Sequence, residues 1–237
     1  MRDYIILNGV NSNTITGLLI STLPPLTKPK QRTQIEEIDG RDGDIITKLG
    51  YSAYNKDVEI GLYGDYDVNE VIQYFNSEGT VTFSNEEDKY YNYQIIDQID
   101  YEKLIRFKKA KVKMHVQPFK YSTVEGTRTF NITSEEEITI NNNGNYVSRP
   151  VVSITGSGTI NLSVNGYEVL VIELGENSTT ITIDTANMEA YNPNTSALMN
   201  RDVTGNYDNL YLNAGSNTIS WTGTVTQIQV TNYSRWL

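Results

Sequence analysis

The stretch that decides the fold is RPVVSITGSGTINLSVNGYEVLVIEL, residues 149–174. It contains runs rich in valine and isoleucine, and such β-branched runs are typical of strands. The runs lie at 150–155, 159–164 and 167–174. Two turn signals separate them, Gly156-Ser157-Gly158 and Asn165-Gly166, and an Asn-Gly pair between apolar runs favours a two-residue hairpin turn. The stretch therefore predicts short consecutive strands joined by turns.

The same pattern continues on both sides of this stretch. Further strands are expected at 128–132, 137–140, 179–183, 209–212, 216–221 and 225–230. Many short strands with regular turn signals favour a β-sandwich or jelly roll. No exact repeat runs through the sequence, which argues against a solenoid or a propeller.

The N-terminal half is also rich in strand patterns, but it is less uniform. A strand at 4–7 leads into Asn8-Gly9, a pair that predicts a hairpin turn with a return strand at 14–21. Prolines 24, 25 and 29 predict an extended loop or arm over 24–30, because proline supplies no hydrogen-bond donor to a sheet. Further strands are expected at 31–38, 58–62 and 80–83, with a polar turn at 40–43.

One helix is predicted in this half. Asp67 can cap its N-terminus, and Glu70 follows three residues later as in a capping box. Apolar residues at spacings of three and four line one face of it, and Gly79 is placed to end it. These apolar residues are Val68, Val71, Ile72 and Phe75.

A long hairpin is expected after the helix, with residues 90–101 paired against 104–116. In the second half of the latter arm apolar and polar residues alternate, whereas Ile105 and Phe107 fall on the opposite phase. A bulge near Lys108-Lys109, or burial of both faces there, would account for the change of phase.

The charge balance changes near residue 130. Residues 1–130 carry 16 Lys and Arg and 19 Asp and Glu, whereas residues 131–237 carry 3 and 10. The second segment has no lysine and is rich in Asn, Ser, Thr and Gly. A change of this kind within one chain indicates two folding units.

The overall composition limits the kinds of function. The net charge of −10 disfavours sequence-independent binding to nucleic-acid phosphate. The chain has no cysteine, so disulfides and thiolate metal sites are excluded. No window approaches the roughly 18 apolar residues that a membrane helix needs. With no cleavage signal at the N-terminus, we expect a soluble protein that is not secreted by the usual route.

Candidate catalytic residues are few. His115 is the one histidine, it lies on the lysine-bearing face of an expected strand, and no nucleophile-elbow motif accompanies it. Acidic runs place neighbouring carboxylates on opposite faces of a strand, which suits solvated edges better than a glycosidase pair. These runs lie at 36–37, 86–88 and 135–137. Asp65 and Asp67 lack the remaining ligands of a calcium loop. We therefore expect no enzyme activity, no cofactor and no metal site.

A carbohydrate-binding module is an alternative, because jelly-roll domains often bind sugars through exposed aromatic residues. The candidates are Tyr191, Tyr207, Tyr211, Trp221, Tyr233 and Trp236. The competing interpretation, which we favour, is that these side chains pack inside the sandwich or in an interface.

The order of these features resembles the distal tail protein of long, non-contractile-tailed phages (siphoviruses) of Gram-positive hosts, over nearly the whole chain. In the N-terminal part the shared features are the Asn8-Gly9 hairpin, the turn at 40–43, the helix, and the phrase Gln117-Pro118-Phe119-Lys120-Tyr121. In the C-terminal part they are 149–154, a hairpin at 156–166, Asp184-Thr185, Met199-Asn200-Arg201, 212–221 and 233–236.

The resemblance implies a mainly β fold with two domains. Residues 1–125 would form a ring-forming tail-hub domain that is β-barrel-like or sandwich-like, with one helix and a long hairpin. Residues 126–237 would form a galectin-like β-sandwich of the jelly-roll type. The resemblance also implies a ring, usually a hexamer, in the virion tail tip or baseplate, where it joins the tail tube to the baseplate and lets DNA pass. The chain is too short for the carbohydrate-binding insertions of some relatives.

The resemblance further implies partners and a place of assembly. The expected partners are other copies of this chain, the major tail tube protein, the tape measure protein, the tail-tip or tail-associated lysin protein, and a receptor-binding protein. No sequence-specific nucleic acid and no membrane are expected, and assembly would take place in the host cytoplasm. The proline-rich segment 24–30 and the hairpin at 90–116 are the elements expected to reach a neighbouring subunit.

Overall fold

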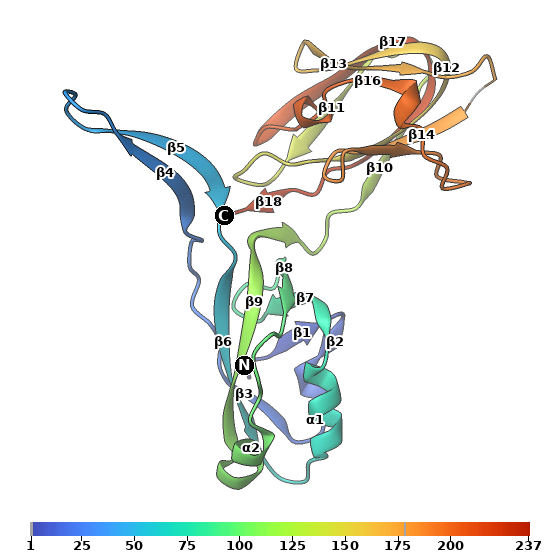
Figure 1. Cartoon of the computed structure of the whole chain (residues 1–237). Helices are drawn as coiled ribbons and strands as arrows, with labels where there is room; N and C mark the ends of the chain where they lie inside the picture. Colours follow the sequence, from blue (N-terminus) through green and yellow to red (C-terminus); the bar gives the residue numbers. More distant parts are fainter. Residues whose placement is uncertain (1, 178) are drawn as a thin grey trace. The chain divides into compact units, whose positions relative to one another are not determined.

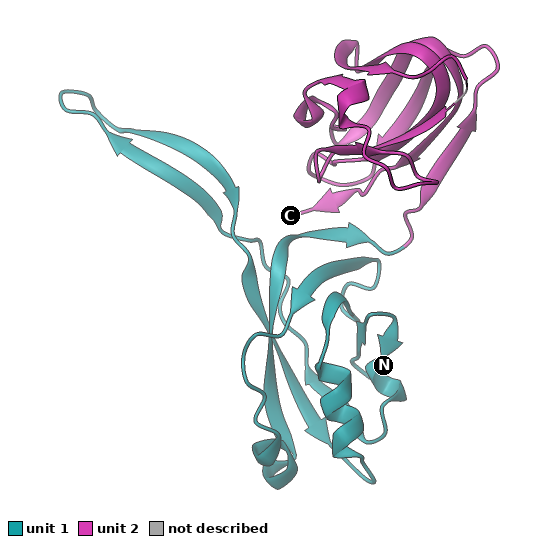
Figure 2. Ribbon diagram, turned by 45° about the vertical axis from the view of Figure 1, so that its right-hand side comes forward, with its two compact units in different colours: residues 1–123, 237 teal, residues 124–236 magenta. Residues whose placement is uncertain are grey.

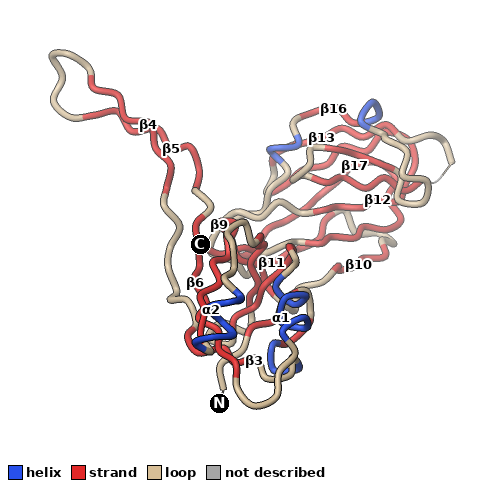
Figure 3. Tube along the Cα trace, turned by 60° about the horizontal axis from the view of Figure 1, so that its bottom comes forward, coloured by secondary structure: helices blue, strands red, loops and turns tan. Residues whose placement is uncertain are grey.

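The chain folds into two compact units (Figure 1). The structure is a computed structural model that describes residues 2–177 and 179–237. Unit 1 comprises the described residues up to Thr123 together with Leu237, and unit 2 comprises Val124–Trp236 (Figure 2). The division falls two residues before the junction at 125 and 126 that the sequence predicts. Strands dominate both units (Figure 3), so the mainly β class is confirmed.

Unit 1 contains an antiparallel sheet, a separate hairpin and short helices. Its strands are β1 (Ile5–Leu7), β2 (Val10–Asn11), β3 (Leu18–Thr22), β4 (Gln31–Glu37), β5 (Asp44–Tyr51), β6 (Tyr54–Leu62), β7 (Glu78–Phe83), β8 (Lys89–Gln94) and β9 (Lys109–Ser122). Its helices are η1 (Ser12–Thr14), α1 (Val68–Phe75) and α2 (Tyr101–Phe107). The order in the sheet is β2-β1-β7-β8-β9-β6-β3. None of the described helices is long and apolar enough to cross a membrane.

Helix α1 begins where the sequence predicts. The Asp67 carboxylate accepts a hydrogen bond from Asn69 N at 2.8 Å, which satisfies one of the free amides of the first turn. Val71 and Phe75 lie about one turn apart, and both are buried in the core of the unit with strand residues such as Val81. Ile72 is 36% exposed, so the buried face of the helix is narrower than the sequence pattern suggests.

The opening of the chain differs from the expected hairpin. Asn8 and Gly9 have φ angles of 48° and 83°, as a type I′ turn requires. The returning strand is only the short β2, because Asn11 caps η1 directly after it. β3 pairs with β6 at the opposite edge of the sheet, so the expected return strand at 14–21 is wrong.

A second helix, α2, replaces part of the expected long hairpin. The Asp100 carboxylate accepts a hydrogen bond from Lys103 N at 2.8 Å, and Lys108 ends the helix with a φ of 57°. Ile105 and Phe107 are therefore out of phase with β9 because they are helical. β8 and β9 pair antiparallel inside the sheet between β7 and β6, from Lys89↔Ser122 to Gln94↔His115, so the expected pairing of 90–101 with 104–116 is wrong in its register. Contact of this element with a neighbouring subunit stays a prediction.

Unit 2 is an antiparallel β-domain built around two long strands. Its strands are β10 (Thr127–Asn131), β11 (Glu137–Asn142), β12 (Val151–Val164), β13 (Tyr167–Glu173), β14 (Thr179–Asp184), β15 (Glu189–Tyr191), β16 (Val203–Gly205), β17 (Gly215–Thr231) and β18 (Arg235–Trp236). The 3-10 helices η2 (Asn200–Asp202) and η3 (Tyr207–Asn209) lie on either side of β16 in the chain. The main path of the sheet is β10-β17-β12-β13-β16, with β11 added to β17 and β14 added to β12.

The long strands β12 and β17 pair along their length and change register together. Gly156 and Gly223 permit this irregularity, because the two strands come too close there for a side chain. A Cβ at Gly156 would lie 2.3 Å from Thr224 O, and a Cβ at Gly223 would lie 2.2 Å from Thr159 O. Each strand covers a region where the sequence predicts two strands with a turn between them. The expected chain reversal at Gly156-Ser157-Gly158 is therefore wrong, whereas the Asn165-Gly166 turn between β12 and β13 is confirmed.

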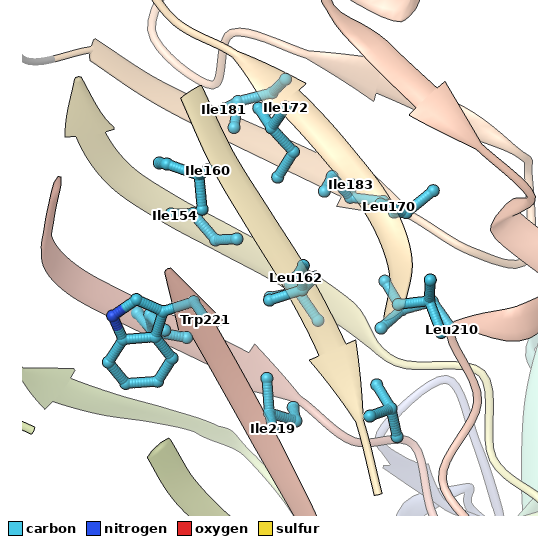
Figure 4. Close-up of a cluster of buried hydrophobic side chains, with 14 of the residues drawn as sticks. Ile154, Ile160, Leu162, Leu170, Ile172, Ile181, Ile183, Leu210, Ile219 and Trp221 are labelled. Carbon is cyan, nitrogen blue, oxygen red and sulfur yellow. The ribbon is translucent and has the colours of Figure 1, made fainter. Parts of the chain in front are cut away.

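The core of unit 2 is made by the inward-facing residues of these strands. Ile154, Leu162 and Ile219 are fully buried, and Figure 4 shows them close to Trp221, which is 5% exposed. Burial of one isoleucine or leucine side chain stabilises a fold by about 1.5–3 kcal/mol. Every second residue over most of β12 is buried in this way, so the strand contributes much of the core that stabilises the unit.

Candidate functional site

The hairpin β4–β5 projects from unit 1 without a buried residue on either strand. The two strands pair with each other from Gln31↔Tyr51 to Glu37↔Asp44, and they form a sheet of their own among the described strands. Figure 2 shows this ribbon running away from the other strands of the unit. A two-stranded ribbon alone is at best marginally stable in water, and its free edges can take up further strands. The hairpin is therefore a candidate assembly surface.

The hairpin carries apolar side chains that the described residues do not cover. Ile35 and Ile46 are directly opposite each other in the ladder, and they are 58% and 60% exposed. Because side chains alternate between faces along a strand, these two isoleucines share one face, and Gln34 and Thr47 share the other. An exposed apolar pair on an otherwise unpaired ribbon is typical of a surface that a partner covers.

The charges of the hairpin are also unevenly distributed. Acidic residues gather toward the turn, where Arg41 is the one basic residue, and they are Glu36, Glu37, Asp39, Asp42 and Asp44. Basic residues gather toward the end where the ribbon joins the sheet, and they are Lys28, Lys30, Arg32 and Lys48. Opposite charges at the two ends of one element suit a head-to-tail contact, in which two different surfaces of the same chain meet.

Side-chain donors from β6 and from the turn between β7 and β8 hold the proline-rich segment that leads into the hairpin. Lys56 Nζ donates a hydrogen bond to Pro25 O at 3.0 Å, and Asn85 Nδ2 donates one to Pro24 O at 3.1 Å. The carbonyl groups of Pro24 and Pro25 lie outside any ladder, so these side-chain donors satisfy them, whereas Lys30 O accepts a backbone hydrogen bond from Ser52 N at 2.9 Å. The entry to the hairpin is fixed to the sheet in this way.

Lys56 is a buried cation, only 2% exposed. Its ammonium group lies 4.9 Å from the centre of the Tyr91 ring and 5.6 Å from that of Phe83. Burial lowers the pKa of Lys56 to about 8, while the negative charge of Glu86 opposes this change and the positive charge of Lys120 adds to it. Glu86 itself accepts hydrogen bonds from Lys120 Nζ at 2.5 Å and from the Tyr91 hydroxyl at 3.0 Å.

The residues considered for catalysis or metal binding do not come together. His115 Nδ1 lies 2.9 Å from Asn55 Oδ1 on a neighbouring strand. Asp67 caps α1, and Glu135 accepts hydrogen bonds from the backbone amides of Thr133 and Ser134, which lower the pKa of Glu135 to about 2. Within residues 2–177 and 179–237, no group of three or more histidines and acids could hold a metal ion. These side chains serve local structure.

A pocket of about 520 Å³ lies in unit 2 beside the β12–β13 turn. Its walls come from this turn, from the start of β13, and from the segment between η3 and β17. The polar and aromatic residues that line it are Asn165, Tyr167, Glu168, Asn209, Tyr211 and Asn213. Buried Val164 and Val169 complete the lining.

The aromatic residues proposed as sugar contacts are scattered. Trp221 is in the core, as the favoured interpretation of packing inside the sandwich predicts, so it does not serve as an exposed sugar contact. Tyr207 packs against the same core, and its hydroxyl is buried with no hydrogen-bond partner among the described atoms. Tyr211 lines the pocket, whereas Tyr233 is exposed outside its lining. Tyr191 and Trp236 are partly buried.

Tyr167 lines the pocket with an exposure of 77%, and the sequence did not single it out. The signal that could have found it is its position directly after the Asn165-Gly166 turn. A tyrosine there stands at the start of a strand, where a hairpin end is open to solvent.

No protein-family profile matches the chain, and no curated protein matches it. Its fold is nevertheless similar to solved structures. One is the crystal structure of the Dit protein of phage SPP1, which is described as a paradigm of the hub adsorption apparatus in phages that infect Gram-positive bacteria. Its TM-score to this chain is 0.64 at 16% sequence identity, and the match covers 100% of both chains. Two structures of the phage P2 baseplate in its activated conformation, with Ca and with Sr, have TM-scores of 0.49 at 10% and 11% identity. They cover 97% and 96% of this chain and 97% of each matched chain. The resemblance to distal tail proteins is thus confirmed at the level of the fold, and this chain has the fold of SPP1 Dit along its whole length.

Proposed function

We propose that this chain is a structural hub subunit of a siphovirus tail, which forms a ring at the distal end of the tail tube. The match of fold to SPP1 Dit over the whole of both chains carries the proposal. The ring is hexameric, joins the tube to the baseplate or tip, and leaves a channel through which DNA passes. The chain acts by assembly, without catalysis.

The exposed hairpin β4–β5 offers a contact surface of the kind that ring formation needs. A ring subunit needs two different, complementary surfaces, because its contacts run head-to-tail. Ile35 and Ile46 offer an apolar pair that a neighbouring copy would bury, and burial of one isoleucine contributes about 1.5–3 kcal/mol. The hydrogen bond from Lys56 to Pro25 fixes the start of the hairpin, so that less conformational entropy is lost when the ribbon docks.

The two domains have different tasks in this proposal. Residues 1–125 form the ring, and residues 126–237 form a galectin-like sandwich that contacts other tail-tip proteins. The partners are the major tail tube protein, the tape measure protein, the tail-tip or tail-associated lysin protein and a receptor-binding protein. The place of action is the virion tail tip, after assembly in the host cytoplasm.

The mass of the purified protein in solution tests the ring. Light scattering coupled to size exclusion should give six times the 26.8 kDa of one chain, and negative-stain images should show rings. Antibody labelling of intact tails should mark their distal end. A protein that stays monomeric at high concentration and does not label the tail end would overturn the proposal.

A pair of variants tests the role of the hairpin. Ile46→Asp places a charge on the apolar face and should leave only subunit-sized protein. Thr47→Asp adds the same charge one residue further on, on the opposite face, and should still form rings. If Ile46→Asp assembles as well as Thr47→Asp, the apolar face of the hairpin is not the contact.

A further inference from the structure

We propose that the pocket beside the β12–β13 turn binds a neutral saccharide. This goes beyond the hub function, because assembly of a ring requires no small ligand. The proposal rests on how the chain builds the pocket, on which polar groups it leaves free there, and on the charge around it.

Two rigid segments build the pocket walls. Leu210 and Leu212 are fully buried, so the alternation along this segment turns Tyr211 and Asn213 to the outside, and the exposed Asn209 ends η3 directly before it. On the other wall the β12–β13 turn is held by the side chain of Asn165. Its Oδ1 accepts a hydrogen bond from Thr218 N at 2.9 Å, and its Nδ2 donates to Asn217 Oδ1 at 3.0 Å.

The polar groups that face the pocket are free. The side chains of Tyr167, Glu168, Asn209, Tyr211 and Asn213 make no hydrogen bond to any residue that the structure describes. Side-chain amides offer two donors and an acceptor, a carboxylate offers acceptors, and a tyrosine hydroxyl offers both. Such a mixed set suits a ligand covered with hydroxyl groups, each of which is both donor and acceptor.

The tyrosines supply the apolar part of the site. Tyr167 and Tyr211 are 77% and 39% exposed, so parts of their rings are open to a ligand. A tyrosine presents a large apolar ring with a polar tip, which matches a sugar ring that has C–H groups on its face and hydroxyls at its edge. The volume of about 520 Å³ lies within the range of about 300–1,000 Å³ that is usual for small-ligand sites.

The charge of the region selects neutral ligands. The lining contains the carboxylate of Glu168 and no lysine or arginine. Residues 131–237 as a whole carry 10 acidic residues against 3 basic ones. A phosphate- or carboxylate-bearing polymer would be repelled, whereas uncharged hexoses and N-acetylated hexoses would not.

Ligand-observed saturation-transfer NMR on the full-length protein, assembled or not, tests the site. The probes are neutral mono- and disaccharides of glucose, galactose, rhamnose, N-acetylglucosamine and N-acetylgalactosamine, with glycerol 3-phosphate as the anionic probe. At least one neutral probe should receive saturation on its ring protons, and glycerol 3-phosphate should receive none. No transfer to any neutral probe, or transfer to glycerol 3-phosphate alone, would overturn the proposal.

Variants then locate the binding. Tyr167→Ala and Tyr211→Ala should each raise the Kd of the bound saccharide at least tenfold. Tyr233→Ala removes a tyrosine of similar exposure, 43%, outside the lining, and should leave the Kd unchanged. Binding that survives in both pocket variants would place the saccharide elsewhere and refute the site. The readout does not depend on ring formation, so it separates this proposal from the hub function.

Discussion

The hairpins β4–β5 and β12–β13 use the same kind of element in opposite ways. Along β12 buried and partly buried residues alternate, and both of its edges are paired, one to β17 and the other to β14 and then β13. Along β4 and β5 no residue is buried, and the ladder ends with the hairpin itself. The stability of β12–β13 therefore comes from contacts within this chain. Among the described residues, β4 and β5 pair only with each other, which is why we propose that a second molecule stabilises them.

The largest effect on stability is expected for a substitution in the hairpin β12–β13. Leu162 on β12 is fully buried, and Leu162→Ala should lower the free energy of unfolding of unit 2 by about 2–5 kcal/mol, since it leaves a cavity in the core. Trp221 and Trp236, the two tryptophans of the chain, lie in unit 2, so urea unfolding followed by tryptophan fluorescence reports on this unit. A loss below about 1 kcal/mol would contradict the view that β12 is held by its own core.

The next effect on stability depends on pH and concerns Lys56, which binds the segment that leads into β4. The pKa of Lys56 is lowered from 10.5 to about 8 by burial, so the folded chain holds this proton less tightly than the unfolded chain. Stability should therefore rise with pH above 8, by up to about 3 kcal/mol at most over the whole window. Lys56→Met should flatten this rise, measured by calorimetry between pH 8 and about 9, where an ordinary tyrosine is still largely neutral.

A matched control separates burial from the removal of a lysine. Lys111→Met removes an exposed lysine that pairs with Asp57 on the surface of the sheet, and it should leave the rise with pH in place. The two tyrosines beside Lys56, Tyr54 and Tyr91, stay neutral in this window, because burial raises the pKa of each hydroxyl. An equal slope in both variants would mean that Lys56 is not the group responsible.

The third effect compares the two turns. Asn165 holds the β12–β13 turn at a φ of 52° and bonds to β17, so Asn165→Ala should cost about 1–3 kcal/mol in unit 2. Asp42→Ala at the turn of β4–β5 should change stability by no more than about 0.5 kcal/mol, because that turn is exposed. Urea unfolding of both variants checks this. Equal losses would mean that the two turns are held alike.

Local signals in the sequence predicted much of the fold. The Asp67 cap, the Asn8-Gly9 and Asn165-Gly166 turns and the alternating strands depend on neighbouring residues alone, and the structure confirms them. The division of the chain into two parts was visible in the charge balance for a similar reason: composition changes are local.

The errors arise where tertiary structure decides between two local outcomes. Residues 101–107 could continue a strand, but the Asp100 cap and burial of Leu104 favour a helix. Gly156 belongs to an expected turn, yet a close approach to the partner strand explains this glycine. The second strand of the hairpin at 44–51 has no clear alternation to reveal it, because neither of its faces is buried. The pocket depends on residues 40 or more positions apart, which no local pattern brings together.

The smallest effect on stability is expected for Ile46→Ala in the isolated subunit. Its dependence on protein concentration tests the contrast between hairpins β4–β5 and β12–β13. Ile46 is 60% exposed, so the substitution should change the free energy of unfolding by no more than about 0.5 kcal/mol at protein concentrations where only single subunits exist. At concentrations where rings form, binding to a partner adds to the stability of the wild type, and the variant should lose part of this gain. Leu162→Ala should instead cost the same at every concentration. Calorimetry over a dilution series distinguishes the two, and an effect of Ile46→Ala that is independent of concentration would show that β4–β5 is held by its own chain after all.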